Sequence, residues 1–149
     1  QRRGLPQILA AGKNLLSDYT FAKDALFARI NLQGDELEMY RRVHEALAEK
    51  IPLPDLLVYL RADTEVLMLR IALRDRSYER NMERGYIDEL NHAYDEFFSK
   101  PYEHTPVLTI DTNLINIVQN PDDLKEVENR IRQALGLAPF QPSLPMSEK

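Results

Sequence analysis

Three short apolar runs alternate along the chain with longer segments in which apolar residues recur every three or four positions. The short runs predict buried strands over about 14–18, 56–61 and 106–111. The longer segments predict helices over about 20–31, 35–50, 64–75, 86–99 and 121–135. Strands that are separated by helices run parallel, because the chain has to cross back between them. The pattern therefore predicts the α/β class with a parallel sheet.

Residues with strong local preferences mark the ends of these elements. Gly12 is expected to end a helix within 1–12, Gly34 breaks the helix over 20–31, and Gly85 separates the segment that follows the helix over 64–75 from the helix over 86–99. Helix starts are expected at Asp35, at Asp63 or Thr64, and at Asn120 followed by Pro121, with Gly136 closing the last helix. Residues 137–149 carry three prolines among polar residues and are expected to form a flexible tail.

The apolar positions also predict which faces are buried. The continuous run Leu56–Leu60 is typical of a strand that is covered on both faces. The inward faces of the last two helices are expected to be Ile87, Leu90, Tyr94 and Phe97 for one, and Leu124, Val127, Ile131 and Leu135 for the other.

The composition limits the class of protein. The 149 residues are enough for one domain, and 44% hydrophobic with 29% charged residues is a globular composition. No run of 18 apolar residues and no N-terminal leader are present, so a membrane span and a signal peptide are not expected. The chain has no cysteine, which excludes a disulfide framework and a thiolate metal site. A cytoplasmic location is the default expectation.

The charge is acidic overall, but one segment is rich in arginine. The formal net charge is −5, which argues against a general nucleic-acid-binding surface. Five arginines nevertheless fall within 15 residues, at positions 70, 74, 76, 80 and 84. Arg70 and Arg74 share a helix face, and Arg76 follows where the helix should end. Guanidinium forks match phosphate oxygens, so the segment could close over a polyphosphate. The alternative is a solvated helix end paired with neighbouring acidic residues.

Three further positions are candidates for substrate binding, each with a structural alternative. Glu79 could accept a hydrogen bond from a ligand hydroxyl, or it could only pair with the neighbouring arginines. Asp18 follows a predicted strand, where it could orient a substrate or contact the water shell of a metal, or it could cap the helix over 20–31. Asp111 also ends a predicted strand, and Asn113 is expected to form the turn after it.

Several other chemistries are not supported. The three histidines have no metal-ligand spacing, so no metal-ligating residue is assigned, and no G-x-S-x-G hydrolase motif is present. The five glycines, at 4, 12, 34, 85 and 136, cannot form G-x-x-x-x-G-K-[ST], so the sequence contains no phosphate-binding loop of that type.

Five segments, in order and spacing, resemble the deoxynucleoside kinase family, and in particular its bacterial deoxyadenosine/deoxyguanosine kinase branch. They lie at Leu15–Tyr19 with Leu26–Ala28, at Pro54–Leu60, at Arg70–Arg76 with Glu79, at Tyr86–Phe98 and at Val107–Asp111. The resemblance implies a three-layer P-loop kinase fold. It also implies transfer of a phosphoryl group from ATP, with Mg²⁺, to the 5′-hydroxyl of a deoxynucleoside, here of the purine class.

The resemblance also implies roles for individual residues. Arg70, Arg74 and Arg76 match lid arginines that clamp the phosphates of ATP, in a lid over about 74–86. Glu79 and Tyr86 match residues beside the deoxyribose, the former at its 3′-hydroxyl. Asn113 begins a turn that would lie by the adenine of ATP. Asp18 stands where eukaryotic members have an arginine, so it is kept only as a substrate-side or metal-side candidate.

The same resemblance implies that residues 1–136 are the C-terminal two-thirds of a kinase domain. The first two strands, the phosphate-binding loop and the general base would then lie upstream, and the 149 residues alone are expected to be inactive. Members of the family commonly form homodimers, and the helices over 20–31 and 35–50 are candidates for that contact. Two alternatives stay open: a nucleoside monophosphate kinase of the thymidylate kinase type, and a non-catalytic nucleotide-binding or interaction domain.

Overall fold

The computed structural model of the chain describes residues 10, 12, 14–48, 51–77, 79, 81–100 and 104–139. The chain divides into two compact units, Gln1–Lys50 and Ile51–Lys149, and each is described by itself. None of the helices within the described ranges is long and apolar enough to cross a membrane.

The first unit contains two helices, as predicted: α2 (Ala22–Asn31) and α3 (Gly34–Ala48). Leu26 of α2 is almost fully buried, with 2% of its surface exposed. Gly34 has φ +54°, a conformation that glycine adopts without strain. Asp35 lies in the first turn of α3 rather than at its cap, where its charge still suits the positive end of the helix dipole.

The strand predicted over 14–18 does not form, and that prediction was wrong. Leu15 and Leu16 are 47% and 94% exposed. The segment has no ladder partner among the residues that the structure describes. A strand requires a neighbour for its backbone N–H and C=O groups, so an apolar run without one stays irregular. The predicted helix end within 1–12 lies outside the described residues except for Ala10, which is helical, and Gly12 with φ +65°.

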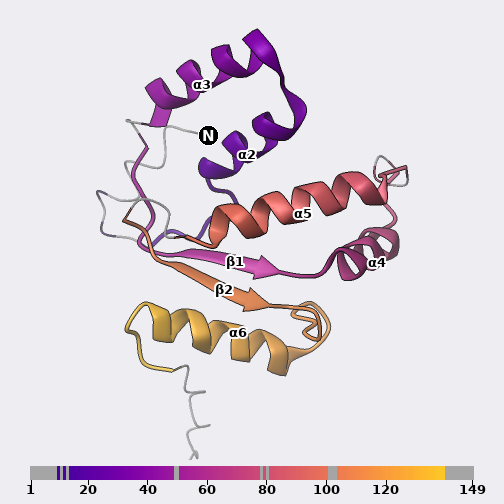
Figure 1. Cartoon of the computed structure of the whole chain (residues 1–149). Helices are drawn as coiled ribbons and strands as arrows, with labels where there is room; N and C mark the ends of the chain where they lie inside the picture. Colours follow the sequence, from indigo (N-terminus) through magenta and orange to yellow (C-terminus); the bar gives the residue numbers. More distant parts are fainter. Residues whose placement is uncertain are drawn as a thin grey trace, which may run out of the picture. The chain divides into compact units, whose positions relative to one another are not determined.

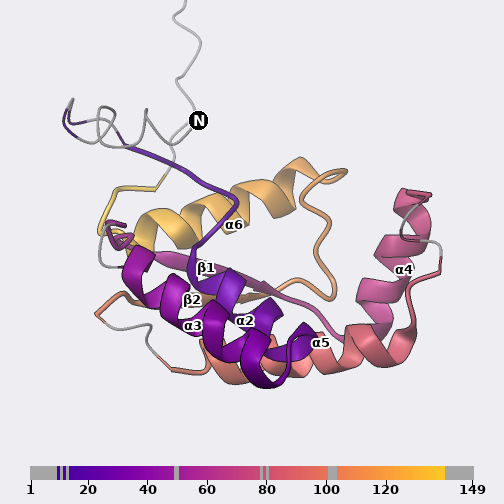
Figure 2. The same ribbon diagram turned by 90° about the horizontal axis from the view of Figure 1, so that it is seen from above.

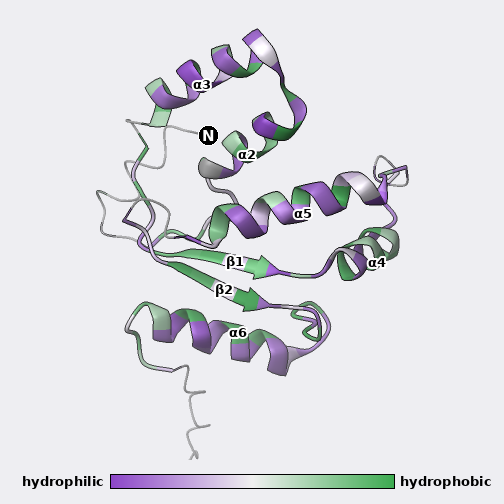
Figure 3. Ribbon diagram, viewed as in Figure 1, coloured by the Kyte–Doolittle hydropathy of each residue, from purple (hydrophilic) through white to green (hydrophobic). Residues whose placement is uncertain are grey.

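The second unit contains a parallel sheet of two strands, β1 (Leu57–Arg61) and β2 (Val107–Asp111) (Figure 1). The strands pair in register from Leu57 opposite Val107 to Arg61 opposite Asp111. Ile110 is fully buried, and both strands are hydrophobic along most of their length (Figure 3). The predicted α/β class with a parallel sheet is therefore confirmed, with two strands where the pattern predicted three.

Helices cover both faces of this sheet, which gives the second unit three layers (Figures 1 and 2). One face is covered by α5 (Arg84–Phe98), where the rings of Phe98 and Tyr59 stack with centroids 5.0 Å apart. The other face is covered by α6 (Pro121–Ala134), where Val127 is 5% exposed. A further helix, α4 (Thr64–Arg74), starts beyond the carboxyl end of β1.

The predicted inward faces are only partly buried. Val127 of α6 is buried, but Leu124 and Leu135 are 51% and 43% exposed. A five-residue strand is about 17 Å long, whereas the 14 residues of α6 span about 21 Å. The two leucines lie near the two ends of α6, which project beyond the sheet. Leu60 is 44% exposed, so β1 is not covered on both faces along its whole length.

The structure confirms most of the predicted helix ends in this unit. The side chain of Asn120 accepts a hydrogen bond from the N–H of Asp122, with Pro121 in the first turn. After α6, Gly136 has φ +67°, and the N–H groups of Gly136 and Leu137 bond back to carbonyls of the last turn. Gly85 does not precede the next helix as predicted, because α5 already begins at Arg84. The predicted tail lies outside the described residues from position 140 onward.

Candidate functional site

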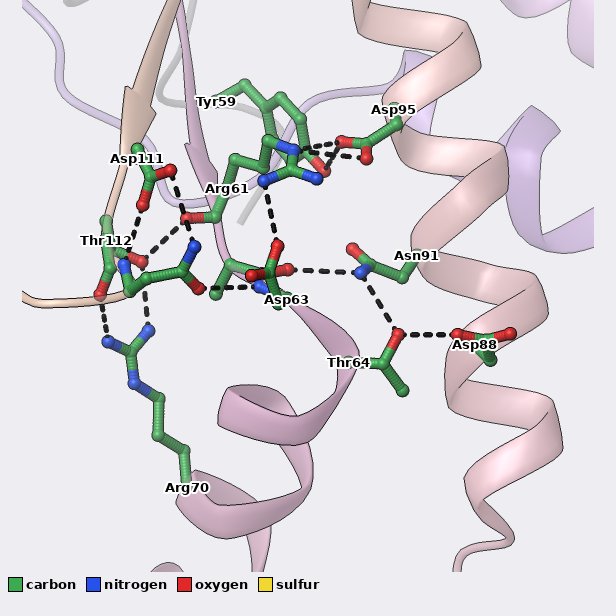
Figure 4. Close-up of polar contacts among 12 residues, drawn as sticks. Tyr59, Arg61, Asp63, Thr64, Arg70, Asp88, Asn91, Asp95, Asp111 and Thr112 are labelled. Carbon is green, nitrogen blue, oxygen red and sulfur yellow. Dashed lines mark hydrogen bonds and ion pairs between the residues drawn. The ribbon is translucent and has the colours of Figure 1, made fainter.

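The turns that follow β1 and β2 meet at the carboxyl edge of the sheet and are joined by short hydrogen bonds (Figure 4). The N–H and the hydroxyl of Thr112 both donate to the carbonyl of Arg61, each at 2.8 Å. The N–H of Asp63 donates to the side-chain oxygen of Asn113, also at 2.8 Å. Asn113 forms the predicted turn after Asp111, because its N–H donates to the Asp111 carboxylate at 2.8 Å. This is the edge at which ligands bind in open α/β sheets.

A polar stripe on α5 fixes the end of β1 and the start of α4 (Figure 4). Asp88, Asn91 and Asp95 are spaced so that they share one face of the helix. Asn91 donates to the carbonyl of Ala62 at 3.1 Å, and Asp88 accepts from the hydroxyl of Thr64 at 2.7 Å. These bonds hold the turn between β1 and α4.

Asp95 binds two side chains of β1. It accepts from the Tyr59 hydroxyl at 2.8 Å and from Nε of Arg61 at 3.1 Å, while Arg61 also donates to Asp63 at 3.0 Å. Burial, and then the bond to the Asp95 carboxylate, raise the pKa of Tyr59. The Asp95 carboxylate is also the main cause of a raised pKa of Arg61. Tyr59 therefore stays a hydrogen-bond donor over the whole physiological range.

Arg70 extends from α4 to the segment that follows β2 (Figure 4). Its guanidinium donates to the hydroxyl and the carbonyl of Thr112 and to the carbonyl of Ile115. Beside it lies an open hollow of about 320 Å³ lined by Leu60, Arg70, Thr112, Ile115, Asn116, Ile117 and Val118. A cationic side chain, an amide and apolar side chains around one hollow suit a flat heteroaromatic ring.

Arg74 and Arg76 converge on one carboxylate. Nη2 and Nε of Arg74 lie 2.7 and 3.0 Å from Oε2 of Glu79, and Nη1 of Arg76 lies 3.9 Å from Oε1. Glu79 is 7% exposed, whereas the arginine side chains are about half exposed. Asp75, with φ +45°, ends α4 and turns the chain toward this cluster. The ion pairing that the sequence left as an alternative for Glu79 is therefore present.

Arg84, the last arginine of this segment, has a different partner from Arg74 and Arg76. Arg84 pairs with Glu65, and both side chains are mostly exposed. Arg80 lies outside the described residues. Tyr86 is half-buried in the first turn of α5.

Asp18 belongs to the first unit and is exposed. It does not cap α2, because Phe21 holds that position and no side chain bonds there. His44 stacks on Phe21 with ring centroids 4.1 Å apart, which fits the structural role expected for the histidines. No group of three His, Asp or Glu side chains that could hold a metal ion occurs in the described parts of the chain.

A comparison with known proteins decides the family. The sequence profile of the deoxynucleoside kinase family matches residues 7–135. The chain belongs to the deoxynucleoside kinase family. It is 27% identical over 130 residues to a deoxyguanosine kinase of Bacillus subtilis (strain 168), covering 85% of this chain and 63% of that protein.

Two relatives from lactobacilli show the same coverage. A deoxyadenosine kinase of Lactobacillus acidophilus is 28% identical over 137 residues, which cover 83% of this chain and 63% of the relative. A deoxyguanosine kinase of Lactobacillus johnsonii is 28% identical over 144 residues, which cover 87% and 63%. The chain thus spans a little under two-thirds of the length of these deoxynucleoside kinases.

Within this member of the deoxynucleoside kinase family, sequence reasoning missed Asp88, Asn91, Asp95 and Thr112. The first three lie on the same helix as the predicted apolar face, and their i, i+3, i+7 spacing is visible in the sequence as a polar stripe. Their partners lie 24–36 residues away, at distances along the chain that no local pattern indicates. Thr112 follows directly after the predicted strand end and carries no signal of its own.

Proposed function

We propose that this chain is the nucleotide-binding part of a kinase that transfers the γ-phosphoryl group of ATP to the 5′-hydroxyl of a purine deoxynucleoside. The observation that carries the proposal is the convergence of Arg74 and Arg76 on one carboxylate. Two guanidinium groups that bind one oxyanion can bind the oxygens of a phosphoryl group in the same way. Family membership and the names of the relatives support this reading.

In this proposal the arginines neutralise charge during transfer. The oxygen of the 5′-hydroxyl attacks the γ-phosphorus, the bond from that phosphorus to the β,γ-bridging oxygen breaks, and the hydroxyl proton leaves to a base. Such a transition state needs positioning and charge neutralisation more than covalent help from the protein. Arg74 and Arg76 supply the positive charge that this requires. No described residue is assigned to the base, and Asp18 is the one metal-side candidate among the described residues.

The other predicted residues take substrate-side roles. Glu79, once Arg74 and Arg76 contact phosphate, is released to accept a hydrogen bond from the sugar 3′-hydroxyl, and Tyr86 is placed beside the same sugar. Asp18 is retained as a substrate-side or metal-side residue of the first unit. Asn113 anchors the turn that begins the hollow beside Arg70, and we propose that this hollow receives the adenine of ATP.

Two further points of the proposal concern the whole protein. The sequence contains no G-x-x-x-x-G-K-[ST], so we expect the 149 residues by themselves to give no turnover. We also propose a homodimer in which α3 takes part, because Met39, Val43 and Leu47 are exposed along one face of that helix. Light scattering measures the mass of the particle directly. A cytoplasmic location stays a prediction from the cysteine-free composition.

The test is a phosphorylation assay on the protein encoded by the complete reading frame. We expect release of ADP and formation of the 5′-monophosphate with deoxyadenosine or deoxyguanosine. No turnover with any of the four deoxynucleosides would overturn the proposal. Competition by dAMP and dTMP separates it from the monophosphate kinase alternative, in which the monophosphates and not the nucleosides are consumed.

A further inference from the structure

We infer that Arg70 is a positioning residue: it fastens the segment 112–118, which lines the hollow, and so controls binding of the donor base rather than the phosphoryl transfer. The inference deepens the proposed function and rests on it for the identity of the donor. It departs from the role that the sequence suggested, in which Arg70 clamps phosphate together with Arg74.

The contacts of Arg70 are with uncharged oxygen atoms of the backbone and one hydroxyl. Nη1 donates to the Thr112 hydroxyl at 3.0 Å, and Nη2 donates to the carbonyls of Thr112 and of Ile115, the latter at 3.1 Å. The N–H of Ile115 bonds to the carbonyl of Thr112 at 3.3 Å, so residues 112–115 form a closed turn. One guanidinium group therefore binds the carbonyls at both ends of this turn.

Thr112 connects this turn to the sheet. It is 5% exposed, and its N–H and hydroxyl both donate to the carbonyl of Arg61 at the end of β1. Its two donor groups are directed to β1 and its carbonyl to Arg70. Removal of the guanidinium would take the Arg70 donor away from the Ile115 carbonyl and would weaken the turn, whereas the strand ladder would persist.

The other side of the segment is held by an opposite charge. The N–H of Asn116 donates to the Asp123 carboxylate at 2.6 Å, and the Asn116 side chain accepts from the N–H groups of Val118 and Gln119 at 3.2 and 3.0 Å. Arg70 on α4 thus binds carbonyls of the segment, and Asp123 on α6 binds one of its N–H groups. These two charged groups hold the segment, and with it the wall of the hollow, in place. The side chains of Leu114 and Val118 are nevertheless 99% and 90% exposed.

These bonds decide between the two roles. To clamp a phosphate, Nη1 and Nη2 of Arg70 would have to leave three acceptors at once, and the hollow would lose its wall as the donor bound. Among the described residues, Arg74, one turn further along α4, bonds to the Glu79 carboxylate and can exchange it for a phosphate without disturbing the sheet edge. The phosphate role therefore belongs to Arg74, and the positioning role to Arg70.

The experiment combines exchange and kinetics on the protein from the complete reading frame. Hydrogen exchange without nucleotide is compared among wild type, Arg70→Ala, Arg70→Lys and the control Arg130→Ala. The guanidinium of Arg130 makes one long hydrogen bond, of 3.4 Å, to the Thr109 carbonyl. We expect faster exchange in 112–118 for both Arg70 variants, and no change there for the control. Unchanged exchange in 112–118 would overturn the inference, and this readout does not require kinase activity.

The kinetic arm separates positioning from chemistry. For Arg70→Ala we expect the KM for ATP to rise at least about tenfold and kcat to change less than about threefold. Added guanidinium chloride at millimolar concentration should lower that KM again. A fall in kcat with an unchanged KM would assign Arg70 to the phosphates instead. If no variant, wild type included, turns over, the proposed function fails while the exchange result still decides the role of Arg70.

Discussion

Two groups of arginines lie close together in the sequence but have different kinds of partner. Arg61 and Arg70, at the edge of the sheet, bond to groups 34–45 residues away, including three oxygens of the segment after β2, and Arg61 also bonds to the neighbouring Asp63. Arg74 and Arg76 bond to Glu79, five and three residues away. Bonds to distant groups hold the fold together, whereas a pairing within one segment can be exchanged for a ligand without unfolding anything.

The largest effect is expected from Arg74→Ala. If Arg74 exchanges its carboxylate partner for phosphate during transfer, removal of the Arg74 guanidinium should lower kcat by roughly 10²–10³-fold. The melting temperature should fall only modestly, because the Arg74 side chain is about half exposed and Glu79, itself 7% exposed, keeps its ion pair with Arg76. Steady-state kinetics at saturating ATP and deoxynucleoside measure the first quantity and circular dichroism the second. Arg42→Ala, which removes an exposed pair on α3, is the matched control. An equal loss of kcat in Arg74→Ala and Arg42→Ala would contradict the assignment of Arg74 to the phosphates.

The edge of the sheet should show the opposite behaviour, with stability affected first. In Asp95→Ala the Tyr59 hydroxyl and Nε of Arg61 lose their acceptor, so we expect the free energy of unfolding to fall by about 2 kcal/mol. Asp63→Ala removes a 59% exposed carboxylate from the same arginine and should cost about 0.5 kcal/mol. Urea denaturation followed by tyrosine fluorescence measures both. Similar losses in the two variants would show that Asp95 has no special part in the fold.

A smaller change is expected from Glu79→Gln, which removes the charge that holds the two arginines. We expect the KM for ATP to fall about threefold, as for an ion pair worth under 1 kcal/mol. The KM for the deoxynucleoside should rise about tenfold, because a charged acceptor for the sugar hydroxyl is lost. The control is Glu65→Gln, whose carboxylate pairs with the exposed Arg84. An unchanged KM for ATP would mean that Glu79 does not compete with phosphate for the arginines.

The sequence predicted best those parts of the fold that local chemistry determines. The Asn120–Pro121 start and the Gly136 end of α6 lie where expected, because caps depend on neighbouring residues alone. The strand over 14–18 failed, because a strand depends on a neighbour that an apolar run does not specify. The prediction that Leu60 is buried was wrong for the same reason, because the burial of a strand face depends on what packs against it.

The candidate site divides in the same way. The arginine-rich segment is visible in the sequence because its members are close together, and the pairing of Glu79 with Arg74 is local. The partners of Arg61 and Arg70 are not visible, because Asp95 and Thr112 come from elements 34 and 42 residues further along the chain. Residue types alone therefore indicated an anion site, but could not distinguish the arginine that holds the structure from those available to a ligand.

The smallest effect is expected in the pH dependence of stability, and it comes from the tyrosines beside the sheet. Burial, and then the nearby Tyr86, raise the pKa of Tyr94 to about 12, and Tyr94 lies beside Tyr59 with ring centroids 6.1 Å apart. In the unfolded chain a tyrosine titrates near about 10. Above that pH the unfolded chain releases the Tyr94 proton while the folded chain retains it, so the free energy of unfolding decreases as pH rises from 10 toward 12.

Tyr94→Phe should make this decrease shallower, because the folded state then retains one proton fewer relative to the unfolded chain. Part of the decrease should remain, since the pKa of Tyr59 is raised as well. Urea midpoints at pH 9, 10 and 11 measure the slope, and Tyr19→Phe, an exposed position in the first unit, is the control. Identical slopes for Tyr94→Phe and wild type would mean that Tyr94 titrates as it does in the unfolded chain.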